Sequence, residues 1–172
     1  LSTAYALDCP SVVRYPRGSG TGAVPEANLD TLPLGKGEII RQGKEVALLA
    51  FGSLVPAALA AGEELDATVA NMRFVKPIDA EMIVELAGNH SLLVSVEENA
   101  VIGGAGSEVE RVMTERGLKV SLVRLGLPDQ FVEHGDPAGL LAECGLDAAG
   151  IVRSVRERLT QNHASRRPGM AA

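Results

Sequence analysis

The stretch of residues 91–113, SLLVSVEENAVIGGAGSEVERVM, constrains the fold of this chain more than any other. An apolar run is followed by two glutamates, a glycine-rich turn and a helical pattern that places Val109, Val112 and Met113 on one face. A strand, a glycine turn and a helix in this order are typical of α/β proteins, which bind anions or line crevices at such turns. The stretch therefore predicts one strand–turn–helix unit of a parallel sheet.

Residues 34–160 continue this alternation of apolar runs and amphipathic segments. The run EVALLAF at residues 45–51 is almost entirely apolar, as in a strand buried on both faces. Strands are predicted at residues 37–41, 45–51, 67–72, 91–96 and 119–125, and helices at 53–65, 79–87, 104–116, 136–144 and from 147, with Ser53, Asp79, Asp136 and Asp147 as helix caps. The alternation predicts a three-layer α/β/α fold with a mainly parallel sheet.

The two ends of the chain differ from this regular middle. Residues 1–8 read as the end of a short helix, and residues 11–15, SVVRY, are predicted to form a strand that stops at Pro16. Residues 18–33 are rich in glycine and proline, which predicts a linker at a domain boundary. Residues 1–17 are thus interpreted as the last elements of another domain, and the polar residues 161–172 as a tail.

Composition and charge argue against several classes of protein. The net charge is −6 and the basic residues form no stripe, which argues against nucleic-acid binding. No apolar run has the length of a membrane span, and the first ten residues lack the features of a signal peptide, so a cytoplasmic protein is expected. Cys9 and Cys144 lie far apart and are expected to be reduced thiols. His90, His134 and His163 have no second ligand at helical spacing, so no metal site is predicted.

The glycine turn is the first candidate site. Gly103, Gly104, Gly106 and Ser107 can present backbone N–H groups and a helix N-terminus to an anion. The dinucleotide-binding fingerprint is incomplete, because Val109 stands at its third glycine position. The alternative is a turn that needs glycine for close packing or for a positive φ. A glycine motif alone is weak evidence, so the residues favour the packing role over an anion site or an interface.

Glu97 and Glu98 end the predicted strand ahead of that turn. Neighbouring strand residues point to opposite faces of a sheet, so the two glutamates are not expected to act as an acid–base couple. One of them is expected to receive the nearby helix N-terminus or an arginine. The other is expected to face solvent or a partner chain, which gives both a structural role.

Two arginines belong to the segment VRYPRGSG near the start of the chain. Arg14 is predicted to lie inside the strand at residues 11–15, in a buried ion pair. Arg17 lies past Pro16, where its side chain is free to reach a ligand. Arginine suits bidentate binding of phosphate. From the residues alone, however, a surface role is favoured for Arg17.

Seven motifs occur together in one order: VRYPRGSGTG, PLGKGEIIRQG, LLAFGSLVPAAL, VANMRFVKPID, LLVSVEENAVIGGAGSEV, LGLPDQFVEHG and GLDAAGI. Together they resemble the C-terminal part of the 1-deoxy-D-xylulose-5-phosphate synthase family, thiamine-diphosphate enzymes of the transketolase group. The resemblance extends to about Leu159. It implies a transketolase C-terminal-domain-like fold for residues 34–160. Residues 1–17 would then be the C-terminal remnant of the pyrimidine-binding domain.

The resemblance also implies a function. Members of the family condense pyruvate with D-glyceraldehyde 3-phosphate and release CO₂, with thiamine diphosphate and Mg²⁺ as cofactors, for isoprenoid, thiamine and pyridoxal phosphate biosynthesis. The arginine of the family's YPRG motif, Arg17 here, contacts the phosphate of the aldehyde. The chain lacks the family's GDG…N motif for metal and diphosphate. By itself it is therefore expected to be inactive and to bind no cofactor, and to function with the remaining domains in a homodimer.

Two alternatives stay open. The first is the matching domain of another thiamine-diphosphate enzyme, either a transketolase or a 2-oxoacid dehydrogenase β subunit. The other alternative belongs to a different class: a non-enzymatic anion-binding or regulatory module that uses the turn at residues 103–107.

Overall fold

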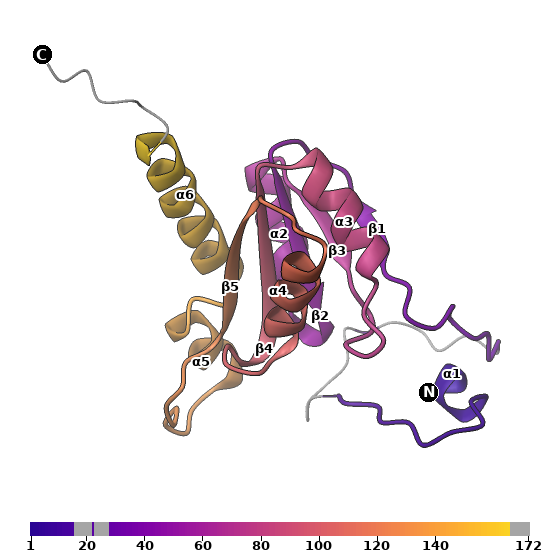
Figure 1. The fold of residues 1–172 in the computed structure, drawn as a ribbon. Coiled ribbons are helices and arrows are strands. Elements are labelled where there is room, and N and C mark those ends of the chain that lie inside the picture. The colour runs from indigo at the N-terminus through magenta and orange to yellow at the C-terminus, as the bar shows by residue number, and fades with distance from the viewer. Residues whose placement is uncertain (16–21, 23–27, 166–172) are drawn as a thin grey trace, which may run out of the picture.

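The computed structural model describes residues 1–15, 22 and 28–165. Its described elements, in chain order, are α1 (Ser2–Tyr5), β1 (Glu38–Arg41), β2 (Val46–Phe51), a 3₁₀ turn (Gly52–Leu54), α2 (Val55–Leu65), β3 (Thr68–Asn71), α3 (Ala80–Asn89), β4 (Leu92–Ala100), α4 (Ala105–Glu115), β5 (Ser121–Leu127), α5 (Pro137–Glu143) and α6 (Ala148–Ser165). The strands form one sheet between two layers of helices (Figure 1). The expected three-layer α/β/α fold is therefore confirmed.

The strand order in the sheet is β1-β3-β2-β4-β5. The four strands β2 to β5 are parallel to one another, and the edge strand β1 pairs with β3 in the antiparallel direction. The chain moves from β2 outward to β3, then crosses back to β4 and continues outward to β5. The two strands at the centre, β2 and β4, thus start connections that run in opposite directions.

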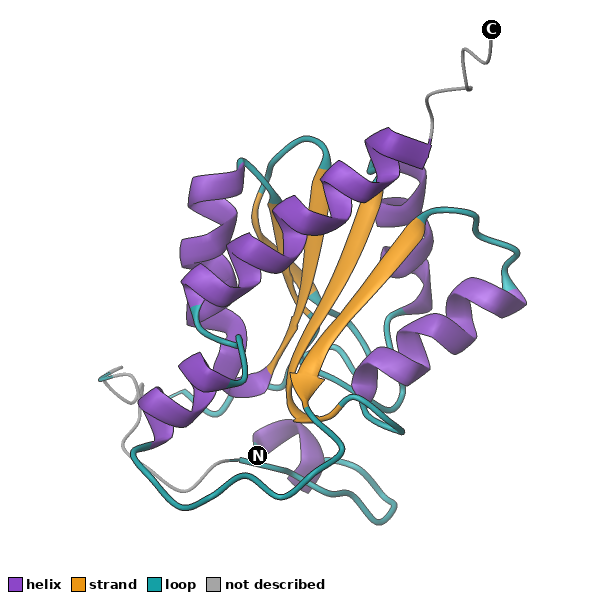
Figure 2. Cartoon of the chain, turned by 90° about the vertical axis from the view of Figure 1, so that its left-hand side faces the viewer, coloured by secondary structure: helices purple, strands orange, loops and turns teal. Residues whose placement is uncertain are grey.

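The core lies on both faces of the sheet. Alternate residues of β2 point to opposite faces, and all six are buried, as expected for the run EVALLAF. On one face they pack against α2 and α6, and Figure 2 shows α6 crossing the strands on that side. On the other face they pack against α3 and α4, with the predicted apolar stripe Val109, Val112 and Met113 buried. None of the described helices combines the length and apolar character needed to span a membrane.

Three of the elements expected from the sequence differ in the structure. Residues 11–15 form no strand, because none of the described strands pairs with them and an isolated strand leaves its backbone groups without partners. β4 continues to Ala100, where it still pairs with Leu127 of β5. α6 continues to Ser165, so the first residues of the predicted tail are helical.

Asp79 is the clearest of the confirmed helix caps. Its carboxylate accepts the Met82 N–H of α3 at 3.2 Å and, across the fold, the Gly37 N–H at 3.1 Å and the Lys36 ammonium at 3.2 Å. Burial of the carboxyl group raises its pKa, but these donors lower it by more, so the pKa of Asp79 lies below its ordinary value. The cap thus also ties the segment before β1 to α3.

We expect Asp79→Asn to lower the free energy of unfolding by about 1–2 kcal/mol at pH 7, because an amide replaces the acceptor for Gly37 and loses the charge that Lys36 meets. The folded-state pKa is lowered, so the ionised carboxylate stabilises the fold above the unfolded pKa, and this contribution disappears as the pH falls through the folded pKa. Urea unfolding at pH 7 and at about pH 3 measures this. A difference between the two proteins that does not shrink at low pH would contradict the assignment.

Candidate functional site

The candidate functional site lies at the carboxyl ends of β2 and β4. Connections leave these two neighbouring strands in opposite directions, which makes the gap between their ends a topological switch point. In open parallel sheets, ligands bind in the crevice outside the carboxyl ends at such a point. β4 carries Glu97 and Glu98 at this edge, and the glycine turn at residues 103–107 follows it.

Glu97 turns its carboxylate into the N-terminus of α4. The residue is only 4% exposed, and it accepts the Ala105 N–H at 2.6 Å and the Gly106 N–H at 2.7 Å. The first N–H groups of a helix have no acceptor within the helix, and the helix dipole favours a negative charge there. The expectation that one of the two glutamates receives this helix N-terminus is confirmed.

Three glycines from two elements make room for this carboxylate. A Cβ atom on Gly104 would lie 2.4 Å from Glu97 Oε2, and one on Gly106 would lie 3.2 Å from Glu97 Oε1 and 2.5 Å from Ser95 Oγ. On β5, a Cβ atom on Gly126 would lie 3.4 Å from Glu97 Cγ. We call Glu97, Gly104, Gly106 and Gly126 the Glu97 socket. It brings together the end of β4, the start of α4 and the end of β5.

The rest of the glycine turn is bonded internally. Gly103 has a φ of +74°, a left-handed conformation that favours glycine, and its N–H donates to Ser107 Oγ at 3.1 Å. The Ser107 N–H donates to the Gly104 carbonyl at 3.0 Å. With Ala105 and Gly106 bonded to Glu97, an external anion at this helix N-terminus would have to displace the protein's own carboxylate.

Ser95 and Arg124 flank the socket. The Ser95 hydroxyl is buried and has no hydrogen-bond partner among the described residues. The Arg124 side chain of β5 is partly exposed, and its guanidinium donates to Ser107 Oγ at 3.2 Å and pairs with Glu110 of α4 at 3.0 Å. These contacts fasten the first turns of α4 to β5.

Glu98 joins three segments of the chain. The Ser53 hydroxyl donates to its carboxylate, and Arg14 Nη2 donates to its backbone carbonyl at 2.9 Å. Two expectations are wrong here. Ser53 does not cap α2, because Gly52, with a φ of +63°, leads into a 3₁₀ turn, and the N-cap residue Leu54 has no side-chain cap. Arg14 is exposed and bonds a carbonyl instead of forming a buried ion pair.

Arg17 lies outside the described residues. Within the described part of the chain, no three His, Cys, Asp or Glu side chains are arranged to hold a metal ion. Cys9 and Cys144 are both free, as expected.

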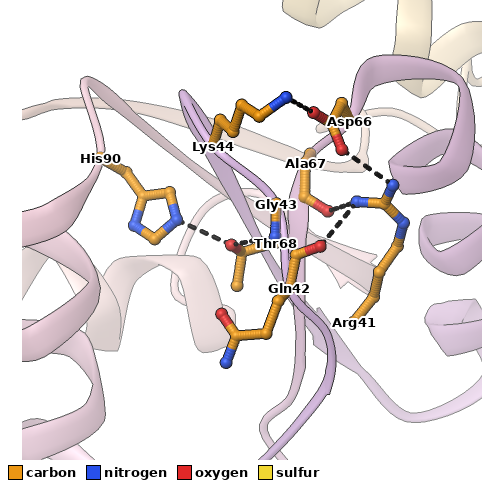
Figure 3. Close-up of polar contacts among 8 residues, drawn as sticks. All are labelled: Arg41, Gln42, Gly43, Lys44, Asp66, Ala67, Thr68 and His90. Carbon is orange, nitrogen blue, oxygen red and sulfur yellow. Dashed lines mark hydrogen bonds and ion pairs between the residues drawn. The ribbon is translucent and has the colours of Figure 1, made fainter.

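A separate polar network lies at the opposite, amino edge of the sheet (Figure 3). His90 contacts the Leu86 carbonyl through Nδ1 at 2.8 Å and the Thr68 hydroxyl through Nε2 at 2.8 Å, and Thr68 also accepts the Gly43 N–H at 3.0 Å. A carbonyl only accepts, so Nδ1 carries a proton that it donates to Leu86, and Nε2 shares the second hydrogen bond with the Thr68 hydroxyl. Both ring nitrogens are thus used to join α3, β3 and the loop before β2.

On the other side of these strand ends from His90, Arg41 donates to the carbonyls of Gln42 at 3.0 Å and Ala67 at 2.6 Å (Figure 3). Asp66 pairs with Lys44 at 2.8 Å and with Arg41 at 3.1 Å. Hydrogen bonds from Lys44 and Arg41 hold the pKa of Asp66 below its ordinary value, and Asp66 raises the pKa of Lys44. Both partners of the Lys44 pair are well exposed, so solvent screens it and it supports the strand ends only modestly.

Sequence reasoning missed the members of the site that come from β5 and from the end of β2. Gly126 interrupts the apolar strand pattern of β5, and an isolated glycine in a strand is a signal for the close approach of other atoms. The sequence pattern predicts a helix cap at Ser53, which is wrong, and it predicts no role for Arg124. No local pattern in the sequence connects either residue with Glu97 or Glu98.

Comparison with known proteins agrees with this architecture. Residues 35–151 match the family model described as "Transketolase, C-terminal domain". The chain is 75% identical over 158 residues to a 1-deoxy-D-xylulose-5-phosphate synthase of Dechloromonas aromatica (strain RCB), and 61% identical over 159 residues to that of Chromobacterium violaceum. These matches cover 92% of this chain but 26% of each relative, so the chain spans about a quarter of the length of these curated relatives.

A solved structure supports the fold. The chain matches a structure described as "Split gene transketolase, inactive beta4 tetramer" with a TM-score of 0.69 and 36% identity, over 80% of this chain and 46% of that one. The matched family model covers more than half of the chain, and the five strands, helices α2 to α5 and the strand–glycine turn–helix block all lie within it. The chain therefore belongs to the transketolase C-terminal domain family, and it is homologous to the C-terminal part of 1-deoxy-D-xylulose-5-phosphate synthases.

Proposed function

We propose that this chain forms the C-terminal part of an enzyme that condenses pyruvate with D-glyceraldehyde 3-phosphate, releasing CO₂ and forming 1-deoxy-D-xylulose 5-phosphate for isoprenoid, thiamine and pyridoxal phosphate biosynthesis. The observation that carries this proposal is the 75% identity over 158 residues to a synthase of that name. The other similar relatives, at 55–61% identity, carry the same name. This agreement favours the synthase over a transketolase or a 2-oxoacid dehydrogenase subunit.

In this proposal, the chain alone is inactive. It spans 26% of the relative's length, and its described residues offer no cluster of ligands that fits Mg²⁺. Thiamine diphosphate, which supplies the carbanion chemistry on pyruvate, and Mg²⁺ would be held by the rest of the enzyme. This chain would supply the C-terminal α/β domain, including the edge of its sheet at the carboxyl ends of β2 and β4.

The partners in this proposal are the remaining domains of the enzyme and a second copy of it in a homodimer. α1 has no buried residue, and Leu1, Tyr5 and Val12 are at least 87% exposed, which fits a segment whose packing partner lies elsewhere. The similar solved structure is described as "Split gene transketolase, inactive beta4 tetramer", which supports an oligomeric assembly. Two free thiols fit a cytoplasmic protein.

Arg17 binds the phosphate of D-glyceraldehyde 3-phosphate in this proposal. A guanidinium presents parallel N–H donors that match two phosphate oxygens and keeps its charge at all physiological pH values. In the sequence, Arg17 comes three positions after Arg14, whose side chain is bonded to the carboxyl edge of the sheet.

The test uses the complete enzyme that contains this chain. We expect Arg17→Ala to lower kcat/KM for D-glyceraldehyde 3-phosphate by about 30- to 700-fold, because loss of a charged pair to phosphate costs about 2–4 kcal/mol. The KM for pyruvate should change little. Steady-state release of CO₂ at varied concentrations of each substrate measures both constants.

Two further results would decide the proposal as a whole. Production of 1-deoxy-D-xylulose 5-phosphate by the complete enzyme, and none by the 172-residue chain, is the expected pair. Turnover by the short chain alone would contradict the proposed division of labour, and a complete enzyme that does not join the two substrates would overturn the activity.

A further inference from the structure

We infer that the carboxyl edge of the sheet, together with the described start of the chain, is a docking surface for an apolar face of the preceding part of the same enzyme. This inference rests on the proposed function, in which the chain is one part of a longer polypeptide. It assigns a protein partner to the edge where open parallel sheets usually bind small ligands.

Exposed apolar side chains gather on one side of the molecule. The loops after β3, β4 and β5 carry Val75, Ile102 and Phe131, of which Val75 is 50% exposed, Ile102 is 69% exposed and Phe131 is fully exposed. Among the described residues, the other large apolar side chains of this class are the neighbour of Phe131 and a group within residues 1–34. None of them lies on helices α2 to α6 or at the amino edge of the sheet.

Several contacts place the start of the chain on the same side as these loops. β1 is antiparallel to its neighbour, so its first residue, Glu38, pairs with Asn71 at the carboxyl end of β3. The Leu32 N–H donates to Thr3 Oγ1 at 2.8 Å, and Arg14 bonds the end of β4 at 2.9 Å. Figures 1 and 2 show α1 on the side of the molecule where the parallel strands end.

A hollow of about 920 Å³ opens in this N-terminal region. Leu1, Ala4, Tyr5, Val13 and Leu29 are among the residues that line it. Because α1 has no buried residue, the hollow lacks the packed wall of a preformed ligand pocket. Its apolar lining suits the side chains of a protein partner that packs against α1.

The outer faces of the helices have the opposite character. Arg116 at the end of α4 pairs with Glu81 at the start of α3 at 2.8 Å, and Arg156 of α6 pairs with Glu64 of α2 at 2.9 Å. Charged residues are depleted in the cores of protein interfaces. These faces therefore suit contact with solvent, which leaves the carboxyl edge as the docking surface.

The exposed area at this edge suits contact between domains. A fully exposed aromatic side chain presents about 150–250 Å², so Tyr5, Tyr15 and Phe131 alone offer roughly 400–700 Å². Interfaces between domains of one chain bury about 600–1,500 Å². An anionic ligand fits this edge less well, because the Glu97 carboxylate already occupies the N-terminus of α4.

The length of the relatives points to the occupant. This chain spans 26% of a relative to which it is 75% identical, so about three-quarters of that relative lies outside the match. In the proposed enzyme the polypeptide continues before Leu1, and Leu1 lines the hollow. The preceding part therefore starts at this surface, whereas a second copy would have to reach it from elsewhere.

The first test measures thiol labelling in the complete enzyme. We expect a maleimide to modify Ile102→Cys and Phe131→Cys at least about tenfold more slowly than Ala60→Cys, because covered side chains react only when the interface opens. Ala60 is the matched control, since it is exposed on α2, away from the carboxyl edge. Peptide mass spectrometry assigns the label to each site. Equal labelling at the three positions would overturn the docking surface.

The labelling experiment also identifies what covers the edge. Slow labelling that persists when the enzyme is diluted to its monomer supports the preceding part of the same polypeptide. Protection that disappears on dilution would assign the edge to a second copy, and protection that requires added substrates would assign it to a ligand. Either of these two results would overturn the inference.

A second measurement uses stability. We expect Ile102→Asp and Phe131→Asp to lower the Tm of the complete enzyme by about 5 °C or more, because each buries a charge in the proposed interface, while Ala60→Asp changes it by less than about 2 °C. Equal shifts in the three variants would contradict the inference.

Activity separates this inference from the proposed function. If the complete enzyme forms 1-deoxy-D-xylulose 5-phosphate but the thiols at positions 102 and 131 react as fast as the control, the inference fails and the proposed function stands. If those thiols are protected in an enzyme that does not join the two substrates, the docking surface stands and the proposed function fails.

Discussion

Glu97→Ala should lower the free energy of unfolding of the 172-residue chain by about 3–4 kcal/mol. The change leaves the buried N–H groups of Ala105 and Gly106 without an acceptor, and each such group costs about 1–3 kcal/mol. It also removes the negative charge that the N-terminus of α4 faces. Water does not replace the carboxylate easily, since Glu97 is 4% exposed. Urea unfolding followed by circular dichroism provides the measurement.

Glu115→Ala is the matched control for this prediction. It removes a carboxylate from the exposed face of the same helix, where Glu115 pairs with Arg111, and should cost less than about 0.5 kcal/mol. Acetate offers a second check, because a small carboxylate can enter the space left in Glu97→Ala and meet the same two N–H groups. Acetate should then raise the Tm of Glu97→Ala more than that of the wild type. Similar losses in Glu97→Ala and Glu115→Ala would show that the socket contributes no special stability.

Gly104→Ala should destabilise the chain by about 2–4 kcal/mol, through overpacking rather than through lost bonds. The added Cβ atom would lie 2.4 Å from the Ala100 carbonyl oxygen and 2.4 Å from Glu97 Oε2, far inside van der Waals contact. The carbonyl belongs to the backbone and cannot swing aside. The carboxylate can move only by weakening its bonds to the start of α4.

Gly88→Ala is the control that separates this clash from the ordinary effect of replacing glycine. Gly88 lies in α3, and a Cβ atom there would meet nothing within 4 Å. Alanine favours helix over glycine, so this variant should gain about 0.5–1 kcal/mol. Opposite signs for the two glycine-to-alanine changes, read from the Tm in the same buffer, are the expected result. A tolerated Gly104→Ala would mean that the turn at residues 103–107 can open, which would restore it as a candidate for external ligands.

Local patterning was sufficient for the class of fold and for most of its elements. The apolar run of β2 and the stripe on α4 have the periods of a buried strand and of an amphipathic helix, and those periods depend only on neighbours in the chain. The caps Asp79, Asp136 and Asp147 bond amides three residues ahead, so a short stretch of sequence contains both partners. The family motifs are equally recognisable from the sequence, because each consists of contiguous residues.

Local patterning failed where the partner of a residue is distant. Residues 11–15 have the β-branched character of a strand, but a strand exists only when another strand accepts its hydrogen bonds. Ser53 stands where a helix cap is expected, yet its hydroxyl bonds Glu98, which is 45 residues away. The end of β4 could not be located from its own residues, because its last pairing is made with Leu127.

The same distinction divides the candidate site. The glutamates and glycines of residues 97–107 mark a strand–turn–helix unit, and the alternation of strand residues already separates the roles of Glu97 and Glu98. Only the assembled sheet brings Gly126 of β5 against Glu97, and Arg14 against the carbonyl of Glu98. These contacts join residues from 29 to 84 positions apart, and their geometry is set by strand order and by the bulge in β4, which are properties of the packed sheet and of no single segment.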